Sequence, residues 1–266
     1  MTLHKSGNLG ELNHNHLTTF GRKVMKRHLK IIGPFKFIIP KIKLIILSGI
    51  IAFNYNCEDA STADNNSSNL LFIASEGNFG QNNGSISVFN EDEKIQELLN
   101  VGDVLQSILV YDNHLYAIVN GNSEIKRYAI SETGLTLPGI TISTNNSSPR
   151  EMCVLNNKLY FSNWNSKDIK VLNLNTFSIE QSISLNGLPE DITTDGSNLY
   201  ASIPHLALYD QGNGTKVVKI DPLTNQITKT YEVGKGPQHL IIHNDNLFIS
   251  RTYYSENWYQ TFFGTA

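Results

Sequence analysis

The sequence contains little cysteine, little charge and few apolar runs. Two cysteines in 266 residues are too few for a disulfide framework. Charged residues make up only 17% of the chain, which excludes a coiled coil, and 19 glycines are far too few for collagen. The apolar runs are too short and too few for a membrane protein with several spans. The length allows one large domain or two small ones.

Asparagine is abundant, and charge is unevenly distributed. The 31 asparagines outnumber lysine and arginine together, which total 21. Asparagine competes for backbone hydrogen bonds and favours turns over long helices. Residues 1–57 carry nine Lys and Arg against one acid, whereas residues 58–266 carry 12 against 23. The bulk of the chain is therefore acidic, which argues against a nucleic acid as its partner.

The first 57 residues have the composition of a targeting segment. A basic stretch over 22–43 precedes ten uncharged residues, Leu44–Phe53. Ten helical residues reach only ~15 Å, about half of a ~30 Å bilayer core, so a signal peptide fits better than a membrane span. The basic stretch is long for a signal, so Met25 is a second candidate for the start of translation.

Cys57 is followed by a polar tether over 58–68, and this arrangement resembles a bacterial lipoprotein whose cysteine carries a lipid. The residues before Cys57, over 54–56, depart from the usual aliphatic and small pattern. Plain secretion and an uncleaved anchor are the alternatives to lipidation at Cys57. Residues 69–266 form the remaining region.

One pattern recurs through residues 69–266: an apolar run, a polar turn and then an anchor dipeptide, Leu-Tyr or Leu-Phe. The anchors are Leu71-Phe72, Leu115-Tyr116, Leu159-Tyr160, Leu199-Tyr200 and Leu247-Phe248. They are spaced by 44, 44, 40 and 48 residues. A period in the forties with short β-type segments is typical of a β-propeller blade. The sequence therefore predicts an all-β fold of four-stranded blades.

Each period divides into four strands, a to d. One period gives Glu151–Leu155, Lys158–Ser162, Asp168–Leu174 and Ser178–Leu185, with a tight turn at 156–157. Cys153 is then a core residue. The chain is expected to enter at strand b of a first blade, complete three blades and stop after strand b of a fifth, with Ala266 in a loop. This count of four to five blades predicts a truncated piece of a propeller, or an open arc that pairs with another copy.

Several segments resemble the YncE-like, YVTN-repeat surface propellers. They are Glu76–Gly80, Asn83–Ser87, Gly102–Ser107, Val119–Asn122, Ser148–Arg150 and Ser250–Tyr254. The resemblance implies a seven-bladed parent, exported or lipid-anchored at the Gram-negative cell surface and mostly without enzyme activity. One branch captures cobalamin for an outer-membrane transporter, and the shared motifs do not assign this chain to that branch.

Two columns of polar residues precede the anchors. The first column is Gln106, Arg150, Glu190 and Gln238, and the second column is Ser107, Glu151, Asp191 and His239. Strand a lines the channel of a propeller, so both columns mark its entrance. The d–a and b–c connections emerge on the same side, which we call the connection face. The predicted ligand-binding residues are Gln106, Asn120, Asn122, Arg150, Trp164, Asn165, Glu190, Gln238, His239, Arg251, Tyr253 and Tyr254.

Aromatic anchors beside adaptable polar groups favour a binding surface. In the alternative interpretation these residues only satisfy turns, Trp164 packs between blades, and Arg150 pairs with Glu190 or Asp191. No catalytic motif is present, and no cofactor or metal is expected. The sequence predicts an exported, surface-anchored, non-enzymatic module that binds a small molecule or an outer-membrane protein partner. Cobalamin capture is one alternative. A metal-dependent, lactonase-like hydrolase using the acids of the columns and His239 is the other.

Overall fold

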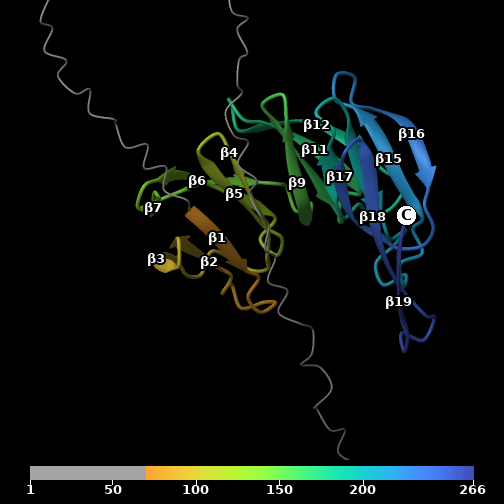
Figure 1. Cartoon of the computed structure of the whole chain (residues 1–266), viewed down its shortest axis with the longest axis horizontal. Helices are drawn as coiled ribbons and strands as arrows, with labels where there is room; N and C mark the ends of the chain where they lie inside the picture. The colour runs from red at the N-terminus through yellow and green to blue at the C-terminus, as the bar shows by residue number, and fades with distance from the viewer. Residues whose placement is uncertain (1–69) are drawn as a thin grey trace, which may run out of the picture.

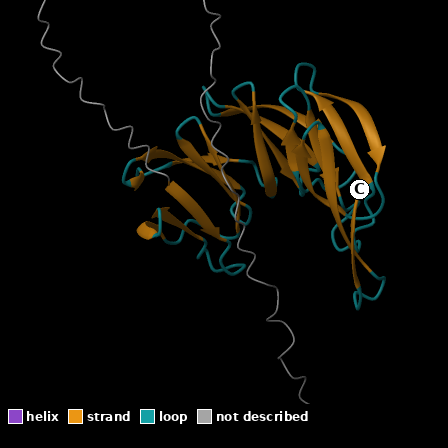
Figure 2. Cartoon of the chain, in the orientation of Figure 1, coloured by secondary structure: helices purple, strands orange, loops and turns teal. Residues whose placement is uncertain are grey.

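The computed structural model describes residues 70–266 and resolves them into nineteen β-strands in five sheets, with no helix in that range (Figures 1 and 2). No helix of this part of the chain could therefore cross a membrane. The predicted leader, the tether and Cys57 lie outside the described residues. All pairings between strands are antiparallel, and the predicted all-β class is confirmed.

The first two sheets are formed by residues 70–143. The first sheet has three strands, β1 (Leu70–Ser75), β2 (Ser85–Asn90) and β3 (Glu93–Leu98). The second sheet contains β4 (Leu105–Tyr111), β5 (His114–Val119), β6 (Glu124–Ser131) and β8 (Ile140–Ser143). A short additional strand, β7 (Gly134–Leu135), pairs with the end of β6 and was not predicted.

The other three sheets follow the same order. The third contains β9 (Pro149–Leu155), β10 (Lys158–Asn163), β11 (Asp168–Asn173) and β12 (Ser178–Ser184). The fourth contains β13 (Ile192–Thr194), β14 (Leu199–Ile203), β15 (Lys216–Asp221) and β16 (Gln226–Glu232). The fifth contains β17 (Pro237–His243), β18 (Asn246–Tyr254) and β19 (Thr261–Thr265). The predicted blade pattern is confirmed, and the sheets succeed one another along an open curve (Figure 1).

The last sheet corrects one prediction. The chain does not stop after strand b, because β19 pairs with β18 and Ala266 exchanges backbone hydrogen bonds with Ile249. Strand β18 also runs on to Tyr254, through residues assigned to a loop. The cause is cross-strand packing: the rings of Tyr253 and Phe262 stack with centroids 5.0 Å apart.

Asparagine occupies the hairpins that join strands a and b in three of the sheets. Asn156 and Asn157 have φ values of 51° and 58°, and the pairs at 112–113 and 244–245 are also left-handed. Two successive positive φ angles define a type I′ turn, whose twist matches that of the strands. Asparagine and aspartate tolerate this conformation better than other non-glycine residues. The tight turn predicted at 156–157 is confirmed.

The core lies between neighbouring sheets, and the anchor dipeptides form its centre. At each interface between neighbouring sheets, the aromatic residue of one anchor lies in the same cluster as the leucine of the next anchor. The four interfaces thus contain the pairs Phe72 with Leu115, Tyr116 with Leu159, Tyr160 with Leu199, and Tyr200 with Leu247. Burying one such side chain contributes roughly 1.5–3 kcal/mol. Cys153 belongs to the same core, as predicted.

Candidate functional site

The connection face is held together by hydrogen bonds between loops of neighbouring sheets. Asn120, after β5, donates from Nδ2 to Ser148 Oγ at 3.0 Å and to the Pro149 carbonyl at 2.8 Å. The Trp164 backbone N–H, after β10, donates to the Ser148 carbonyl at 3.0 Å. Each b–c loop therefore meets a d–a connection on one side of the sheets, where the predicted site residues are found.

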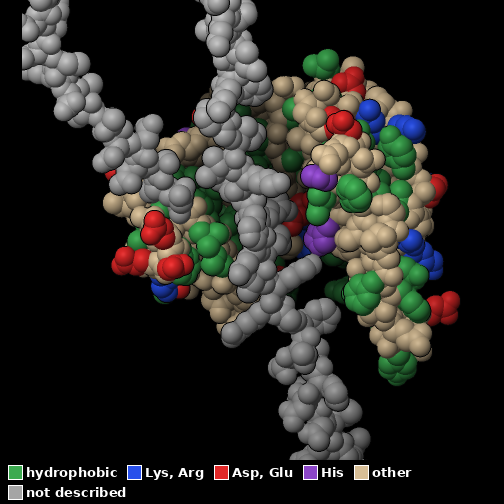
Figure 3. Space-filling view, viewed as in Figure 1, with side chains coloured by type: hydrophobic (Ala, Val, Ile, Leu, Met, Phe, Trp, Pro, Cys, Tyr) green, Lys and Arg blue, Asp and Glu red, His purple; other side chains and the backbone are tan. Residues whose placement is uncertain are grey.

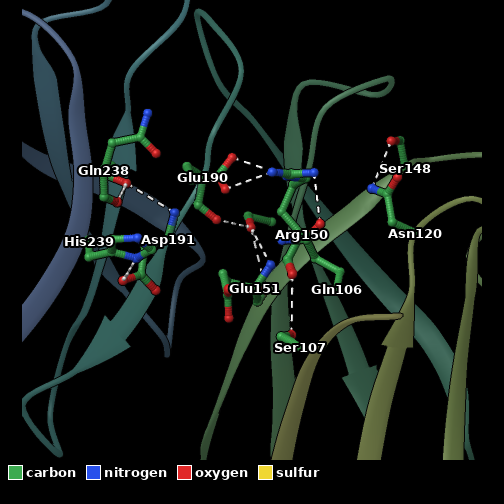
Figure 4. Close-up of polar contacts among 12 residues, drawn as sticks. Gln106, Ser107, Asn120, Ser148, Arg150, Glu151, Glu190, Asp191, Gln238 and His239 are labelled. Carbon is green, nitrogen blue, oxygen red and sulfur yellow. Dashed lines mark hydrogen bonds and ion pairs between the residues drawn. The ribbon is translucent and has the colours of Figure 1, made fainter. Parts of the chain in front are cut away.

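Three first-column residues from successive sheets form a continuous row (Figure 4). Arg150 donates from Nε and Nη2 to the two carboxylate oxygens of Glu190, at 3.0 and 2.9 Å, and from Nη1 to Gln106 Oε1 at 2.9 Å. The side chains of Arg150 and Glu190 are 19% and 8% exposed. Burial alone would lower the pKa of Arg150, but the attraction and hydrogen bond of Glu190, together with the charges of Glu151 and Glu76, raise the pKa. We call Gln106, Arg150 and Glu190 the Arg150 row.

An aromatic group lies against the Arg150 row. The Arg150 guanidinium carbon is 4.2 Å from the centroid of the Trp164 ring, within the range of a cation–π contact. The Trp164 ring meets His205 edge-on at 5.6 Å. The buried Trp164 Nε1–H has no hydrogen-bond partner within residues 70–266. Trp164 therefore packs between sheets, as the alternative interpretation expected, with its ring against Arg150 and its Nε1–H buried.

His205 is fixed by the loop that contains it. Its Nδ1 lies 2.6 Å from Asp210 Oδ1. The same carboxylate accepts hydrogen bonds from the backbone of Leu206 and Gly212. Burial alone would raise the pKa of Asp210, but these hydrogen bonds, led by the one from Leu206, lower it. The 205–213 loop is thereby ordered next to Trp164.

The second column is engaged mainly in joining sheets. Asp191 accepts from the Ile192 N–H through Oδ1 and from the Leu240 N–H through Oδ2, both at 2.8 Å. His239 Nδ1 lies 3.8 Å from the same Oδ2. Glu151 is buried in β9, and its backbone N–H donates to Ser162 Oγ at 3.1 Å. Figure 4 shows this column beside the Arg150 row.

The predicted asparagine contacts connect loops to one another. Besides Asn120, Asn122 Oδ1 accepts from the Asp103 N–H at 2.7 Å, and Asn165 Nδ2 donates to the Asn146 carbonyl at 3.2 Å. Gln238 contributes its backbone carbonyl, which accepts from Ser202 Oγ at 2.8 Å. For Asn120, Asn122 and Asn165 the side-chain bonds are those expected of residues that satisfy turns.

The three predicted residues of the last sheet form a separate group. Arg251 donates from Nε to the Lys235 carbonyl at 3.0 Å, and Tyr253 stacks on Phe262. Tyr254 packs against Trp258, with ring centroids 4.9 Å apart. These contacts are made with β19, with the loop between β18 and β19, and with the connection that enters β17. The structure therefore divides the predicted site into the Arg150 row with Trp164 and this group on β18.

A serine three residues after the anchor leucine was missed by the sequence reasoning. Ser162 Oγ donates to the Glu190 carbonyl at 2.6 Å, and Ser202 Oγ donates to the Gln238 carbonyl. Ser162, Ser202 and Ser250 each also accept the N–H of the second-column residue in their own sheet. The signal in the sequence was the common spacing from the anchor. These serines set the position of the first-column residues.

Comparisons with known proteins support the fold. No family model matches the chain, and no curated protein matches its sequence. It is similar in structure to hydrazine synthase from Kuenenia stuttgartiensis, with a TM-score of 0.56, 15% identity and coverage of 72% of this chain and 54% of that chain. It is also similar to the Neurospora crassa Pan2 WD40 domain, with a TM-score of 0.53, 16% identity and coverage of 75% of this chain and 58% of that chain. For streptogramin B lyase the TM-score is 0.54 and the identity 15%, and the match covers 74% of this chain and 64% of that chain.

These neighbours are β-propeller proteins, so the chain is a β-propeller module. It spans little more than half the length of the first two. At such low identity the likeness concerns the fold alone. The YncE-like family remains a prediction from the sequence.

Proposed function

We propose that this chain is a non-enzymatic binding module of the YncE-like type and that its ligand is bound on the connection face at the Arg150 row. The observation that carries the proposal is the union of Gln106, Arg150 and Glu190 from successive sheets, beside the Trp164 ring. Binding sites commonly pair a rigid aromatic ring with a few fixed polar groups.

The chemistry of the row favours a polar ligand with hydrogen-bond acceptors. The three bonds made by Arg150 use Nε and one N–H of each terminal nitrogen, which leaves further N–H groups on those nitrogens. A buried donor without a partner costs about 1–3 kcal/mol, and because Trp164 Nε1 is buried, a ligand acceptor would recover part of that energy only if the ring shifted on binding. An amide- or hydroxyl-rich small molecule, or a loop of a partner protein, has suitable groups.

We also propose that the protein is exported and attached to a membrane by a lipid on Cys57. The basic and apolar leader and the polar tether support this localisation. Partition of the expressed protein between detergent and water tests it. The native chain should enter the detergent phase and Cys57→Ser should stay in water. Equal partition of the two would exclude a lipid at Cys57.

The cobalamin alternative is tested on the same surface. In equilibrium dialysis, the 266-residue chain at micromolar concentration should retain a corrinoid if it belongs to that branch. Maltooligosaccharides and amide-rich cofactors are dialysed in parallel as probes of the wider proposal. If no probe is retained by the native chain, the small-molecule form of the proposal fails, and affinity capture with outer-membrane proteins tests the partner form.

A matched pair of variants distinguishes the site from general stability. Trp164→Ala removes the ring beside Arg150, and Phe177→Ala removes the ring 4.3 Å from Arg127 in the turn between β11 and β12. Strand c–d turns emerge opposite the connection face. Retention of the bound probe should fall about tenfold or more for Trp164→Ala and stay unchanged for Phe177→Ala. Equal loss in both variants would contradict the proposal.

The hydrolase alternative has less support. Its carboxylate ligands would include Glu190, whose two oxygens are both occupied by Arg150. Within residues 70–266 no group of three or more His, Cys, Asp or Glu side chains is placed to hold a metal ion. Lactone hydrolysis that is abolished by a chelator would nevertheless establish this alternative over the binding module.

A further inference from the structure

The interface between the second and third sheets combines two halves. The forward half consists of the anchor aromatic residue and its partner on strand a, such as Tyr116 with Leu109. The backward half consists of the anchor leucine of the next sheet and its partner on strand c, such as Leu159 with Leu172. Both halves lie in one apolar cluster.

The interface between the third and fourth sheets repeats this arrangement. Its forward half is Tyr160 with Cys153, and its backward half is Leu199 with Ile220. All four residues belong to one buried cluster. Two successive interfaces therefore pair a forward half with a backward half although their residues differ.

The last sheet presents a forward half that no other sheet of residues 70–266 covers. Phe248 is the anchor aromatic residue, and it pairs across the strands with Ile241. Phe248 is 54% exposed and Ile241 is 64% exposed, whereas Tyr116 and Tyr160 are buried. Phe263, opposite Thr252 on β19, is also exposed. Figure 3 shows hydrophobic side chains at this end of the molecule.

The first sheet presents the complementary backward half. Leu71 is the anchor leucine, and it pairs across the strands with Phe89. Leu71 is 43% exposed, although the equivalent Leu115, Leu159 and Leu199 are fully buried. A soluble protein rarely exposes contiguous apolar surface without a binding role. The two ends of one chain thus carry the two halves of one further interface.

We propose that the last sheet of one copy of this chain binds the first sheet of a second copy, head to tail. A second copy is the expected partner because it repeats the interfaces inside the chain. By analogy with those interfaces, Phe248 and Ile241 should pack on a leucine and an apolar strand c residue. Leu71 and Phe89 of the second copy are such residues. Such a contact is heterologous, because different surfaces of the two copies meet.

The test is the mass of the 266-residue chain in solution, measured by size exclusion with light scattering over a concentration series. Cys57→Ser is included throughout, so that neither a lipid nor a disulfide contributes. The chain with both surfaces intact should have a mass greater than that of one chain at micromolar concentration. Phe248→Asp and Leu71→Asp should each weaken association about a hundredfold or more, because a carboxylate would be buried without a partner. A chain that stays monomeric at tens of micromolar overturns the proposal.

Mixing the two variants separates head-to-tail binding from other modes. Phe248→Asp keeps an intact first sheet and Leu71→Asp keeps an intact last sheet, so an equimolar mixture should form a complex that neither variant forms alone. This recovery also shows that both variants are folded. Association of Leu71→Asp by itself would indicate contact between two last sheets and would overturn the proposal. Ile227→Asp, on the outer strand β16, is the control and should associate like the native chain.

Discussion

Arg150 and Glu190 form a two-pronged ion pair between successive sheets, with Nε and Nη2 of the arginine 3.0 and 2.9 Å from the two carboxylate oxygens. The geometry matches the planar fork of guanidinium to the carboxylate, which is the strongest arrangement of this pair. Because both side chains are largely removed from water, each depends on the other for compensation of its charge. The pair therefore contributes to the position of the sheets as well as to the candidate site.

Removing one member of this pair is expected to destabilise the chain. Glu190→Ala should lower the free energy of unfolding by about 3 kcal/mol, because Arg150 is left partly buried without its counter-charge. The double variant Arg150→Met with Glu190→Leu should lose clearly less, since no unpaired charge remains. Urea denaturation followed by tryptophan fluorescence measures both. A double variant that is as unstable as Glu190→Ala, or less stable, would contradict the ion-pair argument.

The buried serines that bridge sheets should be worth more than exposed ones. Ser162 Oγ donates to the Glu190 carbonyl and accepts the Glu151 N–H, so Ser162→Ala leaves two buried backbone groups without partners. We expect a loss of about 1–3 kcal/mol in urea denaturation. Ser178→Ala, at an exposed position that begins β12, serves as the control and should change stability by less than about 0.5 kcal/mol. Equal effects would show that the bridge is not energetically important.

Asp191 should be sensitive to loss of its acceptor atoms. Its Oδ2 accepts the N–H of Leu240, which is buried at the interface of the fourth and fifth sheets. Asp191→Ala should cost about 1–3 kcal/mol, because that N–H loses its partner. Asp191→Asn keeps one acceptor oxygen and should cost less. Thermal unfolding of the two variants makes the comparison, and a less stable Asp191→Asn would argue that charge matters more than the hydrogen bond.

The fold was largely predictable because the repeat fixes it. Each Leu-Tyr or Leu-Phe anchor has one apolar side chain on each face of its strand, as a period of two requires, so both faces must be covered by neighbouring sheets. The pair Asn156-Asn157 marked one of the hairpins. The extension of β18 was missed because residues 251–254 are polar and aromatic, and their strand character arises from stacking on β19.

The candidate site was predicted only in part. The common register of Gln106, Arg150 and Glu190 correctly placed them on one face. It did not identify whether Arg150 would pair with Glu190 or with Asp191. Successive residues of an extended chain point in opposite directions, and the structure turns Asp191 to Leu240 while Glu190 faces Arg150. Asparagines on the same loops resembled ligand contacts, yet an asparagine side chain can equally satisfy a nearby backbone group. Sequence alone does not separate these roles.

The turn between β13 and β14 contains a carboxylate that is expected to make stability depend on acid pH. Asp195 accepts from the backbone of Ser197 and Asn198 at 2.8 and 2.6 Å and from the Tyr200 hydroxyl at 2.9 Å. Burial alone would raise the pKa of Asp195, but the hydrogen bonds, led by those from Asn198 and Ser197, lower it to about 2. The folded state therefore binds the proton less readily than the unfolded state, whose pKa is near the ordinary 3.8.

It follows that the charged form of Asp195 stabilises the folded chain fully above about pH 4 and that this contribution is lost as the pH falls toward about 2. The difference in free energy of unfolding between the native chain and Asp195→Asn should be constant near neutral pH and shrink below about pH 4. Tyr200→Phe removes one of the hydrogen bonds that lower the pKa of Asp195, so its acid-induced loss should be smaller and should be complete at a higher pH. A difference that stays constant across the acid range would show that the Asp195 carboxylate does not have a lowered pKa.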